Sequence, residues 1–477
     1  MDKKKIIILG AGPAGLAAAW KLAQAQKEVV VLEKEDGVGG LCRTLQHDGF
    51  YFDLGGHRFI TSDEPLRQEI QELMGDELLL SPRKSVIRLR KKYFQYPLEF
   101  KNLLMRMDGA LLLKSIADYM YALVARKLFY KKDISFEDWC VNRFGRTLYD
   151  IYLGVYTEKI WGISPKNISA DWAAQRISLL NLWDVFLRLM GKASNRPRTY
   201  FLEFAYPKLG IGRICERMAQ EVVKHGGNIH LNARVKKIIL KDEFIQKIIY
   251  QQQGQDIEIT GDWYVSTIPM PDFVKGLDSD ISERYLETAN NLRFRAVRFL
   301  NLVIEGKPIT DNAWIYIPEK EFLFFRIQEP KNYSRFTSPE GKTSLILEMA
   351  CDFDDWVWNA SDKDIFERCV KDLKKLGLFE VKRIKDYFTA RIQHGYPVYD
   401  LEYKKKVDRI MELLRGMDNL IPIGRQGLYR YNNMDHSIKM GLLTASHILH
   451  GGLQARIFSI ASESVAFEIE KNAATRI

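Results

Sequence analysis

The sequence predicts an α/β fold made of a discontinuous parallel-sheet domain, a helical domain and a mixed β-sheet domain. At the N-terminus, the apolar run "IIIL" leads into the glycine-rich "GAGPAG", and a helical pattern follows. Residues 100–190 keep a helical period, whereas segments such as "RFLNLVIEG" and "TSLILEMACDF" alternate as strands do. We expect the first domain at 1–85, 205–270 and 415–477, the helical domain at 100–204, and the β-sheet domain at 86–99 and 271–414.

The N-terminal unit has the spacing of a dinucleotide-binding site. Gly10, Gly12 and Gly15 form G-x-G-x-x-G between a buried strand and a helix, and Glu33 ends the next strand. Gly10 allows the tight turn, Gly12 lets the backbone approach a pyrophosphate, and Gly15 lets the helix pack on the strand. The helix N-terminus faces the phosphates, and the carboxylate of Glu33 accepts hydrogen bonds from ribose hydroxyls. These features predict a Rossmann-type domain.

Composition narrows the class of protein. The 477 residues are 46% hydrophobic and 28% charged, which is typical of a globular protein with two or three packed units. The five scattered cysteines argue for a reducing compartment, the cytoplasm, and against disulfides or a CxxC metal site, so we expect no metal. The net charge of +10 favours anionic partners, but no basic run with ordered aromatics indicates nucleic acid.

The apolar stretch from Gly109 to Tyr130 leaves two interpretations open. It contains Lys114, Asp118 and Arg126, too many charges for a membrane span. One interpretation is a buried amphipathic helix. The other is a helix that lies on the anionic inner face of a membrane and touches it through residues 109–132, because the stretch ends in "ARKLFYKK".

Two segments beyond the second strand point to FAD. "EKEDGVGGLCRT" contains Gly40 and Arg43, and "GFYFDLGGHRFIT" contains Gly55, Gly56 and His57. Both resemble motifs of the large FAD family that includes amine oxidases, protoporphyrinogen oxidases, phytoene desaturases and UDP-galactopyranose mutases. The resemblance implies that these residues bind FAD, with the histidine against the isoalloxazine ring.

Further segments, in the same order, are similar to those of UDP-galactopyranose mutases. They are "YFQYPLEF", "VYTEKIWGISP", "DNAWIYIPEKEFLFFRI", "RIQHGYPVYDLE" and "GRQGLYRYNNMDHS". The resemblance implies an FAD-dependent mutase that interconverts pyranose and furanose forms of a UDP-sugar, UDP-galactose first, through an adduct between the sugar and N5 of reduced flavin. It also implies a role in cell-surface polysaccharide biosynthesis.

The same resemblance assigns roles to individual residues. Arg326 and Arg425 hold the diphosphate from two sides and act with His57 as the catalytic residues. Further FAD contacts are Gly424, Met434 and Ser437. The remaining substrate-binding residues are Tyr96, Tyr156, Trp161, Arg176, Trp314, Tyr316, Tyr396, Tyr431 and Asn433. The basic loop 191–210 takes the place of a mobile lid over the nucleotide.

An FAD-dependent oxidoreductase, similar to protoporphyrinogen oxidases, amine oxidases or desaturases, is the alternative, because it would use the same N-terminal motifs. Arg326 and Arg425 favour an anionic sugar nucleotide, since guanidinium groups bind phosphate through charge-assisted hydrogen bonds. Glu99 stands where eukaryotic mutases carry an amide, so the sugar and the nucleobase stay open. The sequence has no second G-x-G-x-x-G domain, so NAD(P)H as a reductant would have to enter the same cleft.

Overall fold

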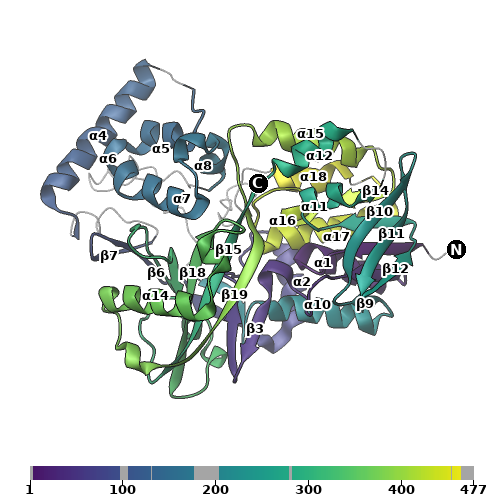
Figure 1. Cartoon of the computed structure of the whole chain (residues 1–477), viewed down its shortest axis with the longest axis horizontal. Coiled ribbons are helices and arrows are strands. Elements are labelled where there is room, and N and C mark those ends of the chain that lie inside the picture. Colours follow the sequence, from purple (N-terminus) through teal and green to yellow (C-terminus); the bar gives the residue numbers. More distant parts are fainter. Residues whose placement is uncertain are drawn as a thin grey trace, which may run out of the picture.

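The computed structural model of the chain describes residues 4–96, 106–129, 132–176, 203–278, 282–452 and 454–462. Figure 1 shows a parallel sheet with its helices, a sheet of long strands beside it, and a group of helices that stands away from both. The predicted α/β class is confirmed.

A five-stranded parallel sheet, in the order β20-β13-β1-β2-β9, forms the centre of the first region. Its strands are β1 (Lys5–Leu9), β2 (Glu28–Leu32), β9 (Asn228–His230), β13 (Trp263–Ser266) and β20 (Leu420–Pro422). The apolar run Ile6–Leu9 is fully buried, as expected for a strand covered on both faces. The strands come from segments far apart in the chain, so this domain is discontinuous.

Helices and a second sheet surround the parallel sheet. The helices are α1 (Pro13–Gln24), α2 (Glu64–Met74), α10 (Gly212–Lys224), α16 (Gly424–Gly427), α17 (Met434–His450) and α18 (Gln454–Ser462). The second sheet contains β10 (Arg234–Lys241), β11 (Phe244–Gln252), β12 (Gln255–Ile259) and β14 (Leu277–Asp278). Helices α1 and α17 pack in direct contact, because a Cβ on Gly441 would lie 2.3 Å from the carbonyl oxygen of Ala14.

Three helices inside the range assigned to the β-sheet domain pack elsewhere. They are α11 (Met270–Lys275), α12 (Glu283–Asn290) and α15 (Tyr403–Arg415). Their apolar residues, including Phe273, Ala289, Ile410 and Leu414, belong to the core of the nucleotide-binding region. Within 271–414, the strands of the sheet region therefore run only from β15 to β19.

The sheet region is a seven-stranded mixed sheet in the order β19-β15-β18-β17-β16-β6-β7. Its strands are β6 (Ser85–Leu89), β7 (Lys92–Gln95), β15 (Phe294–Glu305), β16 (Trp314–Tyr316), β17 (Arg326–Gln328), β18 (Lys342–Cys351) and β19 (Ile384–Pro397). Only the β16–β6 pair among these is parallel. Helices α13 (Trp356–Asn359) and α14 (Asp362–Leu376) accompany this sheet, and α14 packs its apolar side on it.

The helical region holds α4 (Gly109–Leu128), α5 (Phe136–Phe144), α6 (Arg146–Leu148), the π-helical turn η3 (Tyr149–Leu153), α7 (Gly154–Trp161) and α8 (Ala170–Arg176). A capping box between Ser135 and Asp138 starts α5. The interpretation of 109–130 as a buried amphipathic helix is wrong, because Ser115 and Ala122 are the buried residues of α4 and its apolar face is exposed. None of the helices in the described part of the chain combines the length and apolarity needed to cross a bilayer.

Two short antiparallel pairs and several 3₁₀ turns complete the chain. The pairs are β3 (Thr44–His47) with β4 (Phe50–Asp53), and β5 (Leu78–Pro82) with β8 (Glu203–Pro207). The turns are η1 (Gly40–Cys42), η2 (Gly75–Glu77), η4 (Pro165–Asn167), η5 (Pro330–Asn332), η6 (Arg335–Thr337) and η7 (Val381–Arg383). The predicted lid loop 191–210 needs a correction, because 203–207 is a strand held by its ladder to β5; residues 191–202 lie outside the described residues.

Candidate active site

A cavity of about 1160 Å³ is lined by residues of the parallel-sheet region, the seven-stranded sheet and the helical region. Pockets for a single small ligand typically measure about 300–1,000 Å³. The cavity therefore has room for a dinucleotide and part of a second molecule.

The turn between β1 and α1 forms one end of this cavity. Gly10 has φ +100°, and a Cβ there would lie 2.3 Å from Oγ1 of Thr267. A Cβ on Gly15 would lie 2.2 Å from the carbonyl oxygen of Gly10, so α1 packs directly on the turn. At Gly12, by contrast, a Cβ would meet no described atom within 4 Å. Gly12 therefore faces open cavity at the N-terminus of α1, where backbone N–H groups attract an anion.

Glu33, at the end of β2, lines the same end of the cavity and is 6% exposed. Its carboxylate accepts hydrogen bonds from the backbone N–H of Ala11 (2.7 Å) and of Glu35 (3.0 Å). Burial raises the pKa of Glu33, and these two bonds oppose the rise. A carboxylate has about four acceptor sites, so Glu33 keeps capacity for ribose hydroxyls.

A second glycine turn lies across from the first. A Cβ on Gly40 would lie 3.3 Å from Cα of Gly12, so the two turns approach backbone to backbone. Arg43 lines the cavity, and its Nη1 lies 2.7 Å from Oδ1 of Asp36. The hydrogen bond from Arg43 lowers the pKa of Asp36.

His57 follows Gly55 and Gly56 in the loop after β4. Its Nδ1 is buried and has no hydrogen-bond partner among the described residues. Burial, and then the charges of Arg425 and Arg326, lower the pKa of His57 to about 3. The imidazole is therefore neutral at ordinary pH and offers a polar atom to an occupant of the cavity.

Arg326 on β17 enters the cavity with its charge balanced. Its Nε and Nη2 donate to the two carboxylate oxygens of Glu348 on β18, at 2.5 and 2.6 Å. Glu348 is fully buried and also accepts from the side chain of Gln328. A Cβ on Gly56 would lie 3.2 Å from Cζ of Arg326, which is a tight contact, so the guanidinium packs closely on the loop.

Arg425, at the start of α16, is held differently. Its Nε donates to the carbonyl oxygen of Asn432 at 3.1 Å, and its Nη2 donates to the same atom. Its Cζ lies 4.4 Å from the ring centroid of Tyr431, which is a cation–π contact. A carbonyl carries no formal charge, so this arrangement orients the guanidinium without neutralising it.

Lys159 on α7 fixes the loop that joins β16 to β17. Its Nζ donates to the carbonyl oxygens of Ile317, Glu319 and Phe324, at 2.8, 2.8 and 2.7 Å. Burial lowers the pKa of Lys159 to about 7. Tyr316 and Arg326 flank the same loop, so this lysine ties the helical region to two side chains of the cavity.

Aromatic side chains form two walls of the cavity. In one wall, Tyr396 stacks on Tyr431 with ring centroids 5.7 Å apart, and Trp172 meets Tyr431 edge-on at 4.9 Å. In the other wall, Tyr316 meets Tyr96 and Tyr156 edge-on, at 5.1 and 5.7 Å. Such rings exclude water, and their hydroxyls remain hydrogen-bond donors.

The cavity lining is strongly basic. Among the described residues, three acidic ones line it: Glu33, Glu35 and Asp272. The basic ones in the same part of the chain number ten: Lys34, Arg43, Arg58, Arg83, Arg234, Lys236, Lys275, Arg326, Arg391 and Arg425. A cavity with this excess of cations attracts anionic ligands.

Most of the residues chosen from the sequence line this one cavity, whereas Gly15 and Trp314 do not. Gly15 packs behind the turn against Gly10, and Trp314 is 2% exposed with its ring centroid 5.2 Å from Cζ of Arg58. Arg176 ends α8, but its side chain lies outside the described residues. The rest are Gly10, Gly12, Glu33, Gly40, Arg43, Gly55, Gly56, His57, Tyr96, Tyr156, Trp161, Tyr316, Arg326, Tyr396, Gly424, Arg425, Tyr431, Asn433, Met434 and Ser437.

Sequence reasoning missed other lining residues, including Arg58, Arg83, Tyr152, Trp172 and Phe325. Two of them could have been found from their position beside a residue already chosen. Arg58 directly follows His57, and Tyr152 precedes Tyr156 by one helical turn. Arg83 could not have been found in this way, because its position in the cavity depends on how the strand ladder β5–β8 meets the seven-stranded sheet.

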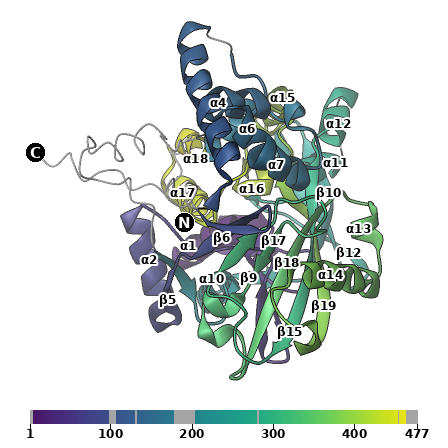
Figure 2. The ribbon, with the colours of Figure 1, turned by 90° about the vertical axis from the view of Figure 1, so that its left-hand side faces the viewer.

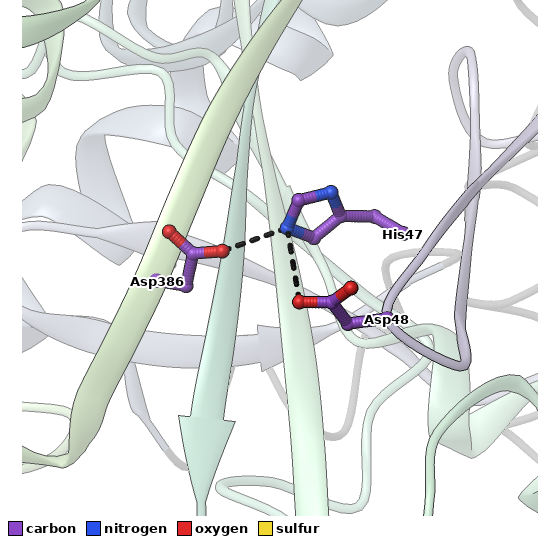
Figure 3. A group of neighbouring side chains, drawn as sticks. All are labelled: His47, Asp48 and Asp386. Atoms are coloured by element: carbon purple, nitrogen blue, oxygen red, sulfur yellow. Dashed lines mark hydrogen bonds and ion pairs between the residues drawn. The ribbon is translucent and has the colours of Figure 1, made fainter.

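One histidine and two carboxylates meet outside the cavity, on the β3–β4 turn and on β19 (Figure 3). Nε2 of His47 lies 2.7 Å from Oδ2 of Asp386 and 3.9 Å from Oδ2 of Asp48. The hydrogen bond from His47 lowers the pKa of Asp386. The ion pairs account for the grouping, and all three side chains are partly or fully exposed.

One protein family matches most of the chain. The family described as "Flavin containing amine oxidoreductase" matches residues 13–387. A probable UDP-galactopyranose mutase of Klebsiella pneumoniae is 22% identical over 465 residues, which cover 94% of this chain and 96% of that protein. An all-trans-retinol 13,14-reductase of Danio rerio is 38% identical, but over 78 residues that span only 13% of its length.

Solved structures show the same fold over the whole chain. The structure of a reduced UDP-galactopyranose mutase aligns with a TM-score of 0.84 and 21% identity, and covers 97% of this chain and 99% of that one. A putative protoporphyrinogen oxidase from Exiguobacterium sp. 255-15 aligns with a TM-score of 0.73 and 16% identity, and covers 94% and 99%.

Proposed function

The chain belongs to the flavin containing amine oxidoreductase family, and we propose that it is an FAD-dependent mutase acting on a UDP-sugar. In this proposal it interconverts the pyranose and furanose forms of the sugar, with UDP-galactose as the first candidate. Support comes from the fold it shares with a UDP-galactopyranose mutase and from the chemistry of its cavity.

The family implies FAD, and the residues of the cavity fit this cofactor. Gly12 leaves open space where a pyrophosphate would approach α1, and Glu33 keeps acceptor capacity for a ribose. The unpartnered Nδ1 of His57, beside Gly55 and Gly56, suits a flat polar ring. When bound in its reduced form, FAD would supply the nucleophile for the anomeric carbon of the sugar.

The basic lining of the cavity is the observation that carries the substrate class. Among the described lining residues, ten lysines and arginines face three carboxylates, and an excess of positive charge remains although Arg43 pairs with Asp36 and Arg326 with Glu348. A sugar nucleotide brings a second diphosphate beside that of FAD, and a positively charged lining suits it.

The protein's own residues would bind and orient this substrate. Arg425 keeps its full charge for a phosphate oxygen, and its contact with Tyr431 fixes its direction. Arg326 has its charge matched by Glu348, so it would direct hydrogen bonds more than charge toward the leaving diphosphate. Tyr316 and Tyr396 would donate hydroxyls and exclude water from the anomeric carbon.

An FAD-dependent oxidoreductase is the second candidate. The family description and the fold shared with a putative protoporphyrinogen oxidase favour it. It would need a cavity suited to an apolar or amine substrate, whereas Arg326 and Arg425 suit an anion. Redox turnover without isomerisation would distinguish this candidate from a mutase.

The test uses purified FAD-loaded protein under anaerobic conditions. Dithionite serves as the reductant, UDP-galactopyranose is added, and chromatography separates the furanose product. We expect furanose with reduced protein and none with oxidised protein. No product, with an unchanged flavin spectrum when UDP is added, would refute a UDP-sugar substrate. If no product forms but UDP clearly shifts the flavin spectrum, the proposed diphosphate site would stand and galactose would be excluded as the sugar.

A further inference from the structure

Helix α4 presents an apolar stripe to solvent. Leu113, Ile116, Met120, Val124 and Leu128 follow one another three or four positions apart, so they share one face of the helix. They are 38–70% exposed. Tyr121 and Phe129, both 76% exposed, extend the stripe sideways and beyond the helix end. A soluble monomer seldom exposes a contiguous apolar surface of this kind unless the surface has a partner.

The opposite face of α4 holds the helix in place. The carboxylate of Asp118 accepts hydrogen bonds from the backbone N–H of Thr147 (2.9 Å) and from its hydroxyl (2.5 Å). A Cβ on Gly145 would lie 2.8 Å from the backbone of Asp118, so the two chains touch here. In both views α4 forms the outer edge of the molecule (Figures 1 and 2). The exposed stripe therefore lies on a helix that its other face holds firmly in the helical region.

Cations surround the apolar stripe. The turn between β6 and β7 lies beside the start of α4, because Lys92 pairs with Asp108 at 2.8 Å and Arg106 donates to the carbonyl oxygen of Tyr93. Together the turn and the helix expose seven basic residues: Arg90, Lys91, Lys92, Arg106, Lys114, Arg126 and Lys127. In residues 90–92 and 106–129 the one exposed acidic residue is Asp108. The surface thus combines apolar side chains with a strong positive charge.

A small apolar cavity opens at the junction of this turn and α4. It measures about 100 Å³ and is lined by residues such as Leu89, Phe94, Leu111 and Ile151. Arg90, Lys92 and Arg106 also line it, together with Asp108 and Glu319. The apolar opening therefore lies beside the cations of this surface, and suits the tail of an amphiphile with a negative head.

We propose that this surface, residues 90–92 with α4, docks on a membrane that contains anionic lipids. The exposed apolar side chains would enter the headgroup boundary, and the cations would meet lipid phosphates and other negative headgroups. A second copy of the chain is disfavoured as the occupant, because two such surfaces would bring like charges together. The helix would lie on the membrane and not cross it.

The experiment is co-sedimentation of the FAD-loaded protein with vesicles. One set is pure phosphatidylcholine, and the other contains about one third phosphatidylglycerol. We expect binding to the anionic vesicles that is at least tenfold tighter than to neutral vesicles and that weakens in high salt. The double variant Leu113→Gln/Val124→Gln and the double variant Lys114→Gln/Lys127→Gln should each weaken it about tenfold. All four side chains are exposed, so the variants should fold and retain flavin.

Leu80→Gln is the matched control, because Leu80 is 74% exposed on β5, outside this surface. It should bind vesicles as the unchanged protein does. Equal binding by the α4 variants, or no binding to anionic vesicles, would overturn the proposal. The protein could instead fail to bind vesicles and form a dimer in analytical ultracentrifugation. If Leu113→Gln/Val124→Gln disrupted that dimer, the surface would be assigned to a second copy.

Discussion

His57 and Arg425 illustrate what single side chains contribute to the cavity. His57 is neutral because burial and two neighbouring guanidinium groups keep its pKa near 3. Arg425 donates its hydrogen bonds to a carbonyl oxygen, which does not balance the positive charge of the guanidinium. One residue therefore offers a polar but uncharged contact, and the other offers a positive charge.

Arg425→Ala should weaken UDP binding by about 2 kcal/mol, or roughly 30-fold, because it removes a charge-assisted contact. Isothermal titration of the FAD-loaded protein with UDP measures this change. Arg425→Lys should recover part of the loss, since an ammonium keeps the charge but not the planar fork. UDP affinity that is unchanged in Arg425→Ala would contradict the assignment.

His57→Ala should change the flavin absorption spectrum or midpoint potential and leave UDP affinity within about threefold. Since the imidazole does not titrate near neutral pH, these differences should stay constant between pH 5 and 9. Spectroscopy and titration of the same preparation report both quantities. His47→Ala, on the exposed β3–β4 turn, serves as the control, and a larger effect of His57→Ala on UDP than on flavin would place the ring away from the cofactor.

At the scale of one element, the β1–α1 turn separates a binding role from a packing role. Gly12→Val should abolish FAD retention without lowering the melting temperature of the apoprotein, because a Cβ at this position would meet no described atom within 4 Å. Gly15→Ala should instead destabilise the fold, since a Cβ there would lie 2.2 Å from the carbonyl oxygen of Gly10. Flavin absorbance and thermal melts distinguish the two. Full flavin content in Gly12→Val would be incompatible with a pyrophosphate at this turn.

How well the sequence predicted an element depended on where its partners lie in the chain. The unit from Gly10 to Glu33 was predictable because its strand, turn and helix pattern is local. The pairing of Arg326 with Glu348 was not, since it depends on the register between β17 and β18. Helices α11, α12 and α15 were assigned to the sheet domain because an amphipathic pattern does not reveal which core its apolar face joins.

The exposed side of α4 was equally hard to predict. Its sequence fits a buried helix and a surface helix alike, and the difference depends on the packing of one face on α5 and α6. Within the cavity, spacing and resemblance identified twenty of the lining residues, spread over the three regions, but not the majority of the lining. Residues such as Arg83 can be assigned to the cavity only from the fold, which brings the regions together.

At the scale of the whole molecule, Asp53 joins segments about 150 residues apart. Its carboxylate is buried and accepts hydrogen bonds from Oγ1 of Thr44 (2.6 Å), the hydroxyl of Tyr206 (2.6 Å) and the backbone N–H of Ile211 (3.1 Å). Burial raises the pKa of Asp53 from 3.8 to about 6, against the opposing effect of these three donors.

The raised pKa of Asp53 predicts a pH dependence of stability. Between pH 3.8 and about 6 the folded protein binds a proton that the unfolded chain releases, so the free energy of unfolding falls as the pH rises. Asparagine does not titrate, so the variant Asp53→Asn loses this pH dependence. Its free energy of unfolding, relative to that of the unchanged protein, should therefore rise by on the order of 3 kcal/mol between pH 4 and 7. Urea unfolding at both pH values measures the difference. Asp48→Asn is the control, and a constant difference for Asp53→Asn would show that Asp53 does not titrate in this window.

The order of strands in the parallel sheet has a consequence for synthesis on the ribosome. β1 and β2 leave the ribosome first, but β1 also pairs with β13, and β13 pairs with β20 at Leu420–Pro422. The first strands must therefore wait, with one edge of β1 unpaired, until most of the chain has been translated. Nascent chains that stop before residue 263 should expose this edge of β1 to chaperones, and chains that stop before residue 420 should expose the edge of β13. A fragment that contains only the N-terminal nucleotide motif should not fold as an independent flavin-binding unit.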